Sequence, residues 1–146
     1  MSYIHIYVHF VWSTKRRAHF LTDDIRPLVF QHIRQNAKEK NIYIDHINGY
    51  TDHVHCLVSL NEDLSISQIA RLLKGESSHW INSNSLTKDP FAWQNKYFAI
   101  GVGDEKLDTV RRYIANQEDH HKQVNYQREY ELLIKRYGFD SLKNDD

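Results

Sequence analysis

The chain has 146 residues, of which 40% are hydrophobic and 26% charged, and its formal net charge is zero. This length and apolar content indicate one domain, residues 1–146, with a core of its own. The single cysteine excludes an internal disulfide and a four-cysteine zinc site, so a metal ion needs histidine, carboxylate, amide or water ligands. The balanced charge argues against a generally basic nucleic-acid coat and leaves only local basic clusters.

No apolar run is long enough to cross a membrane, and the first residues lack the pattern of a secretory signal. We therefore expect a cytoplasmic protein without a membrane partner. Ten histidines are many for this length, and their placement matters more than their number.

The first predicted elements are strands and one helix. Residues 2–14 alternate between apolar and polar side chains, which predicts a strand. Apolar residues at helical spacing follow over 22–40, and residues 42–50 read as a second strand that ends at the turn signal Asn48-Gly49. The strand around His53 comes next, so the second and third strands are expected to form an antiparallel pair.

The second half of the chain is richer in helices. A second helix is expected to begin at the capping box Ser65-Ile66-Ser67-Gln68 and to continue through Gly75. A polar loop leads to a strand over 97–102. C-terminal helices are expected over about 104–138. A third helix is predicted to begin at Gly103-Asp104 and to reach His121, and a final helix, over about 126–137, to stop at Gly138, the usual punctuation of a helix end.

This order of elements predicts an α+β fold, a ferredoxin-like βαββαβ sandwich with one antiparallel sheet plus additional C-terminal helices. Strands one and three are expected at the centre. Alternate side chains of a strand face opposite ways, so Val54, Cys56 and Val58 are predicted to pack against the first two helices. The opposite face, which we expect to be uncovered, carries four histidines: His5, His9, His53 and His55.

His53 and His55 have a spacing that suits joint coordination of one metal ion. Such a pair is also common as two ordinary polar positions on a half-exposed strand. Tyr113 and Gln117 are four residues apart and are predicted to share one helical face. Two imidazoles and an amide can bind a divalent ion, which would polarise a phosphate that the Tyr113 hydroxyl attacks. Taken alone, Tyr113 also fits an amphipathic position at a helix–sheet boundary.

In their order along the chain, these residues resemble the single-tyrosine HUH transposases, the TnpA type encoded by small bacterial insertion sequences. The similarity rests on His53-Val54-His55 followed by Tyr113-x-x-x-Gln117 and covers nearly the whole chain. Other matching segments are Trp12-Ser13-Thr14-Lys15-Arg16-Arg17, Leu73-Lys74-Gly75-Glu76-Ser77-Ser78 and Trp93-Gln94-x-x-Tyr97-Phe98-Ala99. The similarity continues from Tyr113 through Asn116-Gln117-Glu118-Asp119-His120-His121-Lys122 into the last helix. The chain departs from the family at Thr51, where proline is common, and at Asn95-Lys96, which replaces a glycine-containing turn.

The resemblance implies a bacterial transposase that cuts and rejoins single-stranded DNA without a nucleotide cofactor. Tyr113 would attack a phosphodiester, forming a 5′-phosphotyrosine link and releasing a 3′-hydroxyl for strand transfer. His53, His55 and Gln117 would hold Mg²⁺ or Mn²⁺ on the scissile phosphate. The implied partners are single-stranded DNA with hairpin ends and a second copy of the chain, in a homodimer whose active sites are composite, built in trans.

Five basic residues are candidate phosphate contacts, although each one singly also fits an ordinary solvated surface. They are Lys15, Arg16, Lys74, Arg111 and Arg112.

Other functions remain compatible with the sequence. A domesticated relative that nicks single-stranded DNA as an endonuclease but no longer transposes would carry the same site. A non-catalytic metal-binding ferredoxin-like module would not need Tyr113 and Gln117 on one face. An RNA-binding module lacks support from strand three, where the RNP1 pattern is absent. Such a module would stack bases on Tyr3, Tyr7, Tyr43 and Tyr97.

Overall fold

The computed structural model describes residues 2–137 of the chain. Four strands form one antiparallel sheet in the order β2-β3-β1-β4. They are β1 (Tyr7–Ser13), β2 (Tyr43–Tyr50), β3 (His53–Ser59) and β4 (Phe98–Val102). With β1 and β3 at the centre, the predicted ferredoxin-like α+β fold is confirmed.

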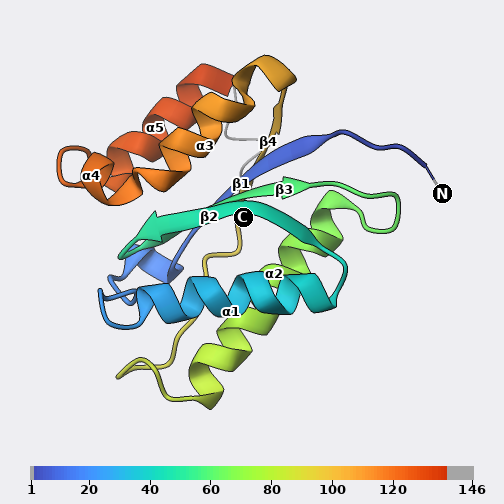
Figure 1. The fold of residues 1–146 in the computed structure, drawn as a ribbon. Coiled ribbons are helices and arrows are strands. Elements are labelled where there is room, and N and C mark those ends of the chain that lie inside the picture. Colours follow the sequence, from blue (N-terminus) through green and yellow to red (C-terminus); the bar gives the residue numbers. More distant parts are fainter. Residues whose placement is uncertain (1, 138–146) are drawn as a thin grey trace.

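Helices α1 (Arg26–Glu39) and α2 (Ile66–Ser83) cover one face of the sheet (Figure 1). The main core lies between them and the strands, where Phe10, Val54, Cys56 and Val58 are completely buried. Full burial of an apolar side chain of this kind stabilises a fold by about 1.5–3 kcal/mol. The predicted inward face of β3 is therefore correct, and it fixes the opposite orientation for the two histidines.

The helix starts follow their local sequence. At α2 the Ser65 hydroxyl accepts a hydrogen bond from the Gln68 backbone N–H, and the Gln68 side chain accepts one from the Ser65 N–H, as predicted. The helix also continues through Gly75. Helix α1 begins later than the predicted residue 22, because Pro27 occupies its first turn, where a missing N–H costs no hydrogen bond.

Two strand boundaries differ from the prediction. Asn48 and Gly49 lie inside β2, and the turn is formed by Thr51 and Asp52. A Cβ atom at Gly49 would lie 2.1 Å from the backbone oxygen of His53, so this glycine allows close strand packing rather than chain reversal. The first strand is also shorter than predicted, because both of its partner strands end opposite Tyr7.

Three C-terminal helices cover the other face of the sheet: α3 (Leu107–Ala115), α4 (Gln117–His121) and α5 (Tyr126–Tyr137) (Figure 1). The expectation of an uncovered histidine face is therefore wrong. Val11 and Leu57 lie on this face and are completely buried, so it needed an apolar cover as much as the first face did. The cover also removes the open sheet that an RNA-binding module of this topology would use.

The C-terminal region is helical, as predicted, but it is interrupted. A single third helix was expected, whereas α3 ends at Ala115 and α4 begins after a distorted Asn116. The last helix starts at Tyr126, as predicted, and its expected end at Gly138 lies outside the described residues. Within residues 2–137, none of the helices has the length and hydropathy needed to cross a membrane.

Candidate active site

Strand β3 presents two fully buried imidazoles, His53 and His55, to the space beneath α3, α4 and α5. His53 Nδ1 donates a hydrogen bond to Asp52 Oδ1 at 2.8 Å. His55 Nδ1 lies 2.8 Å from Nε2 of His9, which comes from the neighbouring strand β1. Because both Nδ1 atoms are engaged, both Nε2 atoms are directed into the same space, as in histidines that bind metal through one nitrogen and are oriented through the other.

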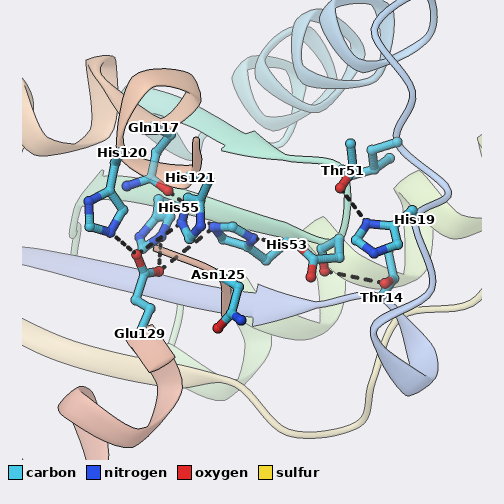
Figure 2. Close-up of polar contacts among 12 residues, drawn as sticks. Thr14, His19, Thr51, His53, His55, Gln117, His120, His121, Asn125 and Glu129 are labelled. Carbon is cyan, nitrogen blue, oxygen red and sulfur yellow. Dashed lines mark hydrogen bonds and ion pairs between the residues drawn. The ribbon is translucent and has the colours of Figure 1, made fainter. Parts of the chain in front are cut away.

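A carboxylate from α5, Glu129, lies in the middle of this space (Figure 2). Its Oε1 atom accepts a hydrogen bond from His55 Nε2 at 2.7 Å and lies 3.7 Å from His53 Nε2. Its Oε2 atom lies 3.1 Å from His121 Nε2. Only 4% of Glu129 is exposed, so this charge depends on its imidazole neighbours for stabilisation.

Tyr113 and Gln117 reach the same site from α3 and α4. The Tyr113 hydroxyl donates a hydrogen bond to Glu129 Oε2, and its ring lies 5.3 Å from that of His55. The Gln117 Oε1 atom lies 3.1 Å from His53 Nε2. The side-chain amide of Gln117 donates to the Tyr113 carbonyl, so the two residues stay on one side despite the break between their helices. The four residues that the sequence predicted as catalytic or metal-binding therefore lie in one site. They are His53, His55, Tyr113 and Gln117.

Burial sets the protonation states here. It lowers the pKa of His9 to about 3 and that of His55 to about 4, which leaves both imidazoles neutral at pH 7, the form that binds metal. Burial alone would raise the pKa of Glu129, but hydrogen bonds from His121 and His55 outweigh it and hold that pKa far below its usual range. Burial and the Glu129 charge both raise the pKa of Tyr113, so its hydroxyl is protonated.

The donor set fits a divalent ion. One ligand atom from each of four residues lies within 4.8 Å of the other three, and all four residues are buried. They are His53, His55, His121 and Glu129. Imidazole and carboxylate are ordinary ligands of divalent metals, so the chemistry of this group is compatible with the metal site that the sequence predicts.

Two of these residues, His121 and Glu129, received no role from the sequence. A signal for Glu129 exists in the periodicity of α5, where Tyr126, Tyr130 and Leu133 form the side that packs on β1 and β4. Glu129 falls at helical spacing within that same stripe, so the sequence places an acid among core positions. A buried acid on an apolar helix face is a sign of a specific partner.

The five predicted basic contacts do not form one patch. Lys15 and Arg16 follow β1, whereas Lys74 lies on α2, on the other side of the sheet from α3. The ammonium group of Lys74 donates to the carbonyls of Gln94 and Asn95, and burial lowers its pKa to about 8.

On α3, Arg111 is paired with Asp45 and Asp108, while Arg112 is exposed. Arg17 is the third residue of the basic cluster Lys15-Arg16-Arg17. Its guanidinium lies 4.8 Å from the ring centre of Tyr130, and with Arg16 it lines a cavity of about 410 Å³ beside α5.

Comparison with known proteins identifies the family. The family model described as "Transposase IS200 like" matches residues 2–117, which include both β3 histidines, Tyr113 and Gln117. The chain belongs to the IS200-like transposases. The sequence-based resemblance is thereby confirmed, and the match ends at Gln117, so most of α4 and all of α5 lie beyond it.

Individual relatives agree with this assignment. The ISDra2 transposase TnpA of Deinococcus radiodurans is 22% identical over 116 residues, which span 76% of this chain and 83% of that protein. A crystal structure of a Deinococcus radiodurans R1 protein assigned as a transposase has a TM-score of 0.64 at 23% identity, covering 80% of this chain and 95% of that one. The REP-associated tyrosine transposase, solved bound to a REP hairpin, has a TM-score of 0.63 at 19% identity, covering 85% and 73%.

Proposed function

We propose that this IS200-like transposase cleaves and rejoins single-stranded DNA, with Tyr113 as nucleophile and a divalent ion, Mg²⁺ or Mn²⁺, at the β3 histidines. The observation that carries the proposal is the position of the Tyr113 hydroxyl, which shares the Glu129 carboxylate with His55. A tyrosine, a side-chain amide and two oriented imidazoles in one buried site match the parts needed for phosphodiester cleavage.

In the proposed reaction the Tyr113 oxygen bonds to phosphorus and the bond from phosphorus to the 3′-oxygen breaks. The products are a 5′-phosphotyrosine link and a 3′-hydroxyl, and attack by another 3′-hydroxyl reverses the step and joins new strands. His53, His55 and Gln117 are the proposed holders of the ion, which supplies Lewis-acid activation of the phosphate. No nucleotide cofactor is needed, because the phosphotyrosine bond conserves the energy of the broken one.

The proposed substrate is single-stranded DNA with hairpin ends. Support comes from the REP-associated relative, which was solved bound to a REP hairpin. Lys15, Arg16, Lys74, Arg111 and Arg112 stay as proposed phosphate contacts. A cytoplasmic bacterial location also remains a prediction.

We also propose a homodimer with sites built in trans. In the single chain the tyrosine helix lies on its own sheet, where Leu107 and Ile114 pack against Leu57. Gly103 and the short 3-10 turn Asp104–Lys106 join β4 to α3, and this link is where the chain would turn toward a partner.

The test is an adduct assay. Wild-type protein incubated with single-stranded element ends and Mn²⁺ should give a denaturant-resistant protein–DNA complex, and EDTA should prevent it. Tyr113→Phe removes only the hydroxyl and should abolish the complex, whereas Tyr126→Phe and Tyr130→Phe should retain it. An adduct that persists in Tyr113→Phe would show that another residue is the nucleophile. Cleavage without any strand transfer would instead favour the domesticated endonuclease.

A further inference from the structure

The segment beyond the family match places two more side chains of metal-ligand type in the candidate active site. His121 ends α4 and Glu129 lies on α5, both after Gln117, where the match stops. Each is more than nine-tenths buried. Both point into the space that His53 and His55 face (Figure 2). The region that covers the site therefore also contributes to its chemistry.

The distances within this group suit a shared ion. Glu129 Oε1 lies 2.7 Å from His55 Nε2 and 3.7 Å from His53 Nε2, and Glu129 Oε2 lies 3.1 Å from His121 Nε2. One ligand atom from each of the four residues lies within 4.8 Å of the other three. Ligands at about 2.0–2.2 Å from one ion are separated by roughly 3–4.5 Å, depending on geometry. Small side-chain shifts are therefore enough to admit an ion among these four groups.

The two Glu129 oxygens face different groups. Oε1 is nearest to His55, while Oε2 meets the Tyr113 hydroxyl, His121 and the partly exposed His120, whose Nε2 lies 2.9 Å away. A carboxylate can bind an ion through one oxygen and accept a hydrogen bond through the other. With an ion on Oε1, Glu129 would keep the Tyr113 hydroxyl close to that ion through Oε2.

We propose that His121 and Glu129 complete the metal site of this chain, and that the resulting set of three imidazoles and one carboxylate prefers a transition-metal ion over Mg²⁺. The proposal rests on the proposed function for the site at His53 and His55. Its chemical basis is ligand type, because Mg²⁺ prefers oxygen ligands and water, whereas imidazole suits first-row transition metals. Its structural consequence is that ion binding fixes α5 over Tyr113.

The experiment measures binding rather than activity. Full-length wild type is titrated calorimetrically with Mn²⁺ and with Mg²⁺, and the visible absorption of added Co²⁺ reports the coordination geometry. The variants are Glu129→Gln, which keeps the size of the side chain, and His121→Ala. Matched controls are Glu131→Gln, an exposed acid on the same helix, and His79→Ala, an exposed histidine on α2.

We expect wild type and both controls to bind Mn²⁺ at least about tenfold more tightly than Mg²⁺. Glu129→Gln and His121→Ala should each weaken Mn²⁺ binding at least about tenfold and alter the Co²⁺ spectrum. Because either variant could also destabilise the fold, each is melted with EDTA and with Mn²⁺. The rise in Tm caused by Mn²⁺ reports binding by the folded protein whatever the starting stability, and it should shrink only in these two variants.

The outcomes separate this inference from the proposed function. Wild-type Mn²⁺ binding in both Glu129→Gln and His121→Ala, together with its loss in His53→Ala, overturns the inference and leaves the histidine pair as the metal site. Equal affinity of wild type for Mg²⁺ and Mn²⁺ overturns the predicted selectivity. Unchanged Mn²⁺ binding in His53→Ala and His55→Ala contradicts the proposed function itself.

Discussion

The Tyr113 hydroxyl donates a hydrogen bond to Glu129 Oε2, so the proposed nucleophile is held by a carboxylate sixteen residues later in the chain. Tyr113 lies within the part matched by the family model, whereas Glu129 lies on the helix beyond it. The carboxylate also accepts from His55. One residue of α5 thus joins the proposed nucleophile to the histidine pair, and the predictions below test what each partner contributes.

Tyr113→Phe should cost stability as well as activity. The substitution removes one hydrogen bond to a buried carboxylate, an interaction that stabilises a fold by about 1.5–3 kcal/mol. We expect the free energy of unfolding, measured by urea titration in EDTA, to fall by roughly that amount. Tyr130→Phe is the control, because it also removes a tyrosine hydroxyl but keeps the ring that contacts Arg17 and Phe98. Equal stability of Tyr113→Phe and wild type would mean that this bond contributes nothing in solution.

Alanine at His53 or His55 should abolish metal-dependent cleavage, and burial adds a second effect. On the uncovered face that the sequence predicts, these substitutions would leave the fold intact. Both are fully buried beneath the C-terminal helices, so each alanine leaves a cavity and removes a partner of Asp52 or Glu129. We expect each variant to lose about 2–4 kcal/mol of stability in urea titrations.

His53→Asn and His55→Asn retain polarity at these positions and provide the comparison. They should recover part of the stability while remaining inactive in the adduct assay. Cleavage in either asparagine variant at the wild-type rate would contradict the assignment of both imidazoles as metal ligands.

Stability should fall as the pH drops below neutrality. His9 and His55 have folded-state pKa values of about 3 and about 4, below the ordinary value of 6.5. The unfolded chain therefore binds more protons than the folded chain between about pH 6.5 and pH 4, and stability declines in that window. The depressed pKa of Glu129 acts in the same direction below its ordinary value of 4.5.

Unfolding in urea with EDTA at pH 7.5, 6, 5 and 4.5 measures this effect, which we expect to total a few kcal/mol. His9→Gln removes one of the titrating groups and should flatten the curve. A stability that stays constant from pH 7.5 to pH 4.5 would contradict burial of these imidazoles as neutral groups.

Cys56→Ala should leave metal binding intact. The side chain lies in the core shared with α1 and α2, on the opposite side of β3 from the histidines, and burial raises the pKa of its thiol. We expect a loss of about 1–2 kcal/mol from reduced packing and an unchanged Mn²⁺ affinity in calorimetry. Loss of the ion in this variant would require a ligand set different from the one proposed.

Strand alternation in the sequence correctly predicted the sheet and the orientation of His53 and His55. It did not predict that the C-terminal helices cover these histidines. Those helices lie far from β1 and β3 in the sequence, and they pack on the sheet at single apolar strand positions such as Val11 and Leu57. The sequence also identified Tyr113 and Gln117, whose spacing survives the break at Asn116. The role of Glu129 was not predicted, because the sequence of α5 indicates a helix with an apolar stripe but does not show that this stripe covers the histidine face of the sheet.

The assembly of the site in trans is the remaining prediction. In one chain, α3 and α5 pack on their own sheet, where Ile114 contacts the Leu57 cluster and Tyr126 contacts the Val11 cluster. The two sheets of a homodimer are identical. Helices that exchanged between two copies would therefore make the same contacts with the partner's sheet. Exchange would carry Glu129 and His121 along with Tyr113, because α4 and α5 follow α3 in the chain.

Mixed dimers decide between the two arrangements. Tyr113→Phe subunits are combined with subunits carrying both His53→Ala and His55→Ala, and exchange is verified by mass spectrometry of the complexes. If the helices exchange, a mixed dimer contains one site with an intact tyrosine and an intact histidine pair, and adduct formation should return to about half of the wild-type level per dimer. If the helices stay on their own sheets, every site lacks one catalytic group and the mixture stays as inactive as its components. Inactivity despite verified exchange would therefore exclude the trans site and leave the arrangement in which Tyr113 serves the histidines of its own chain.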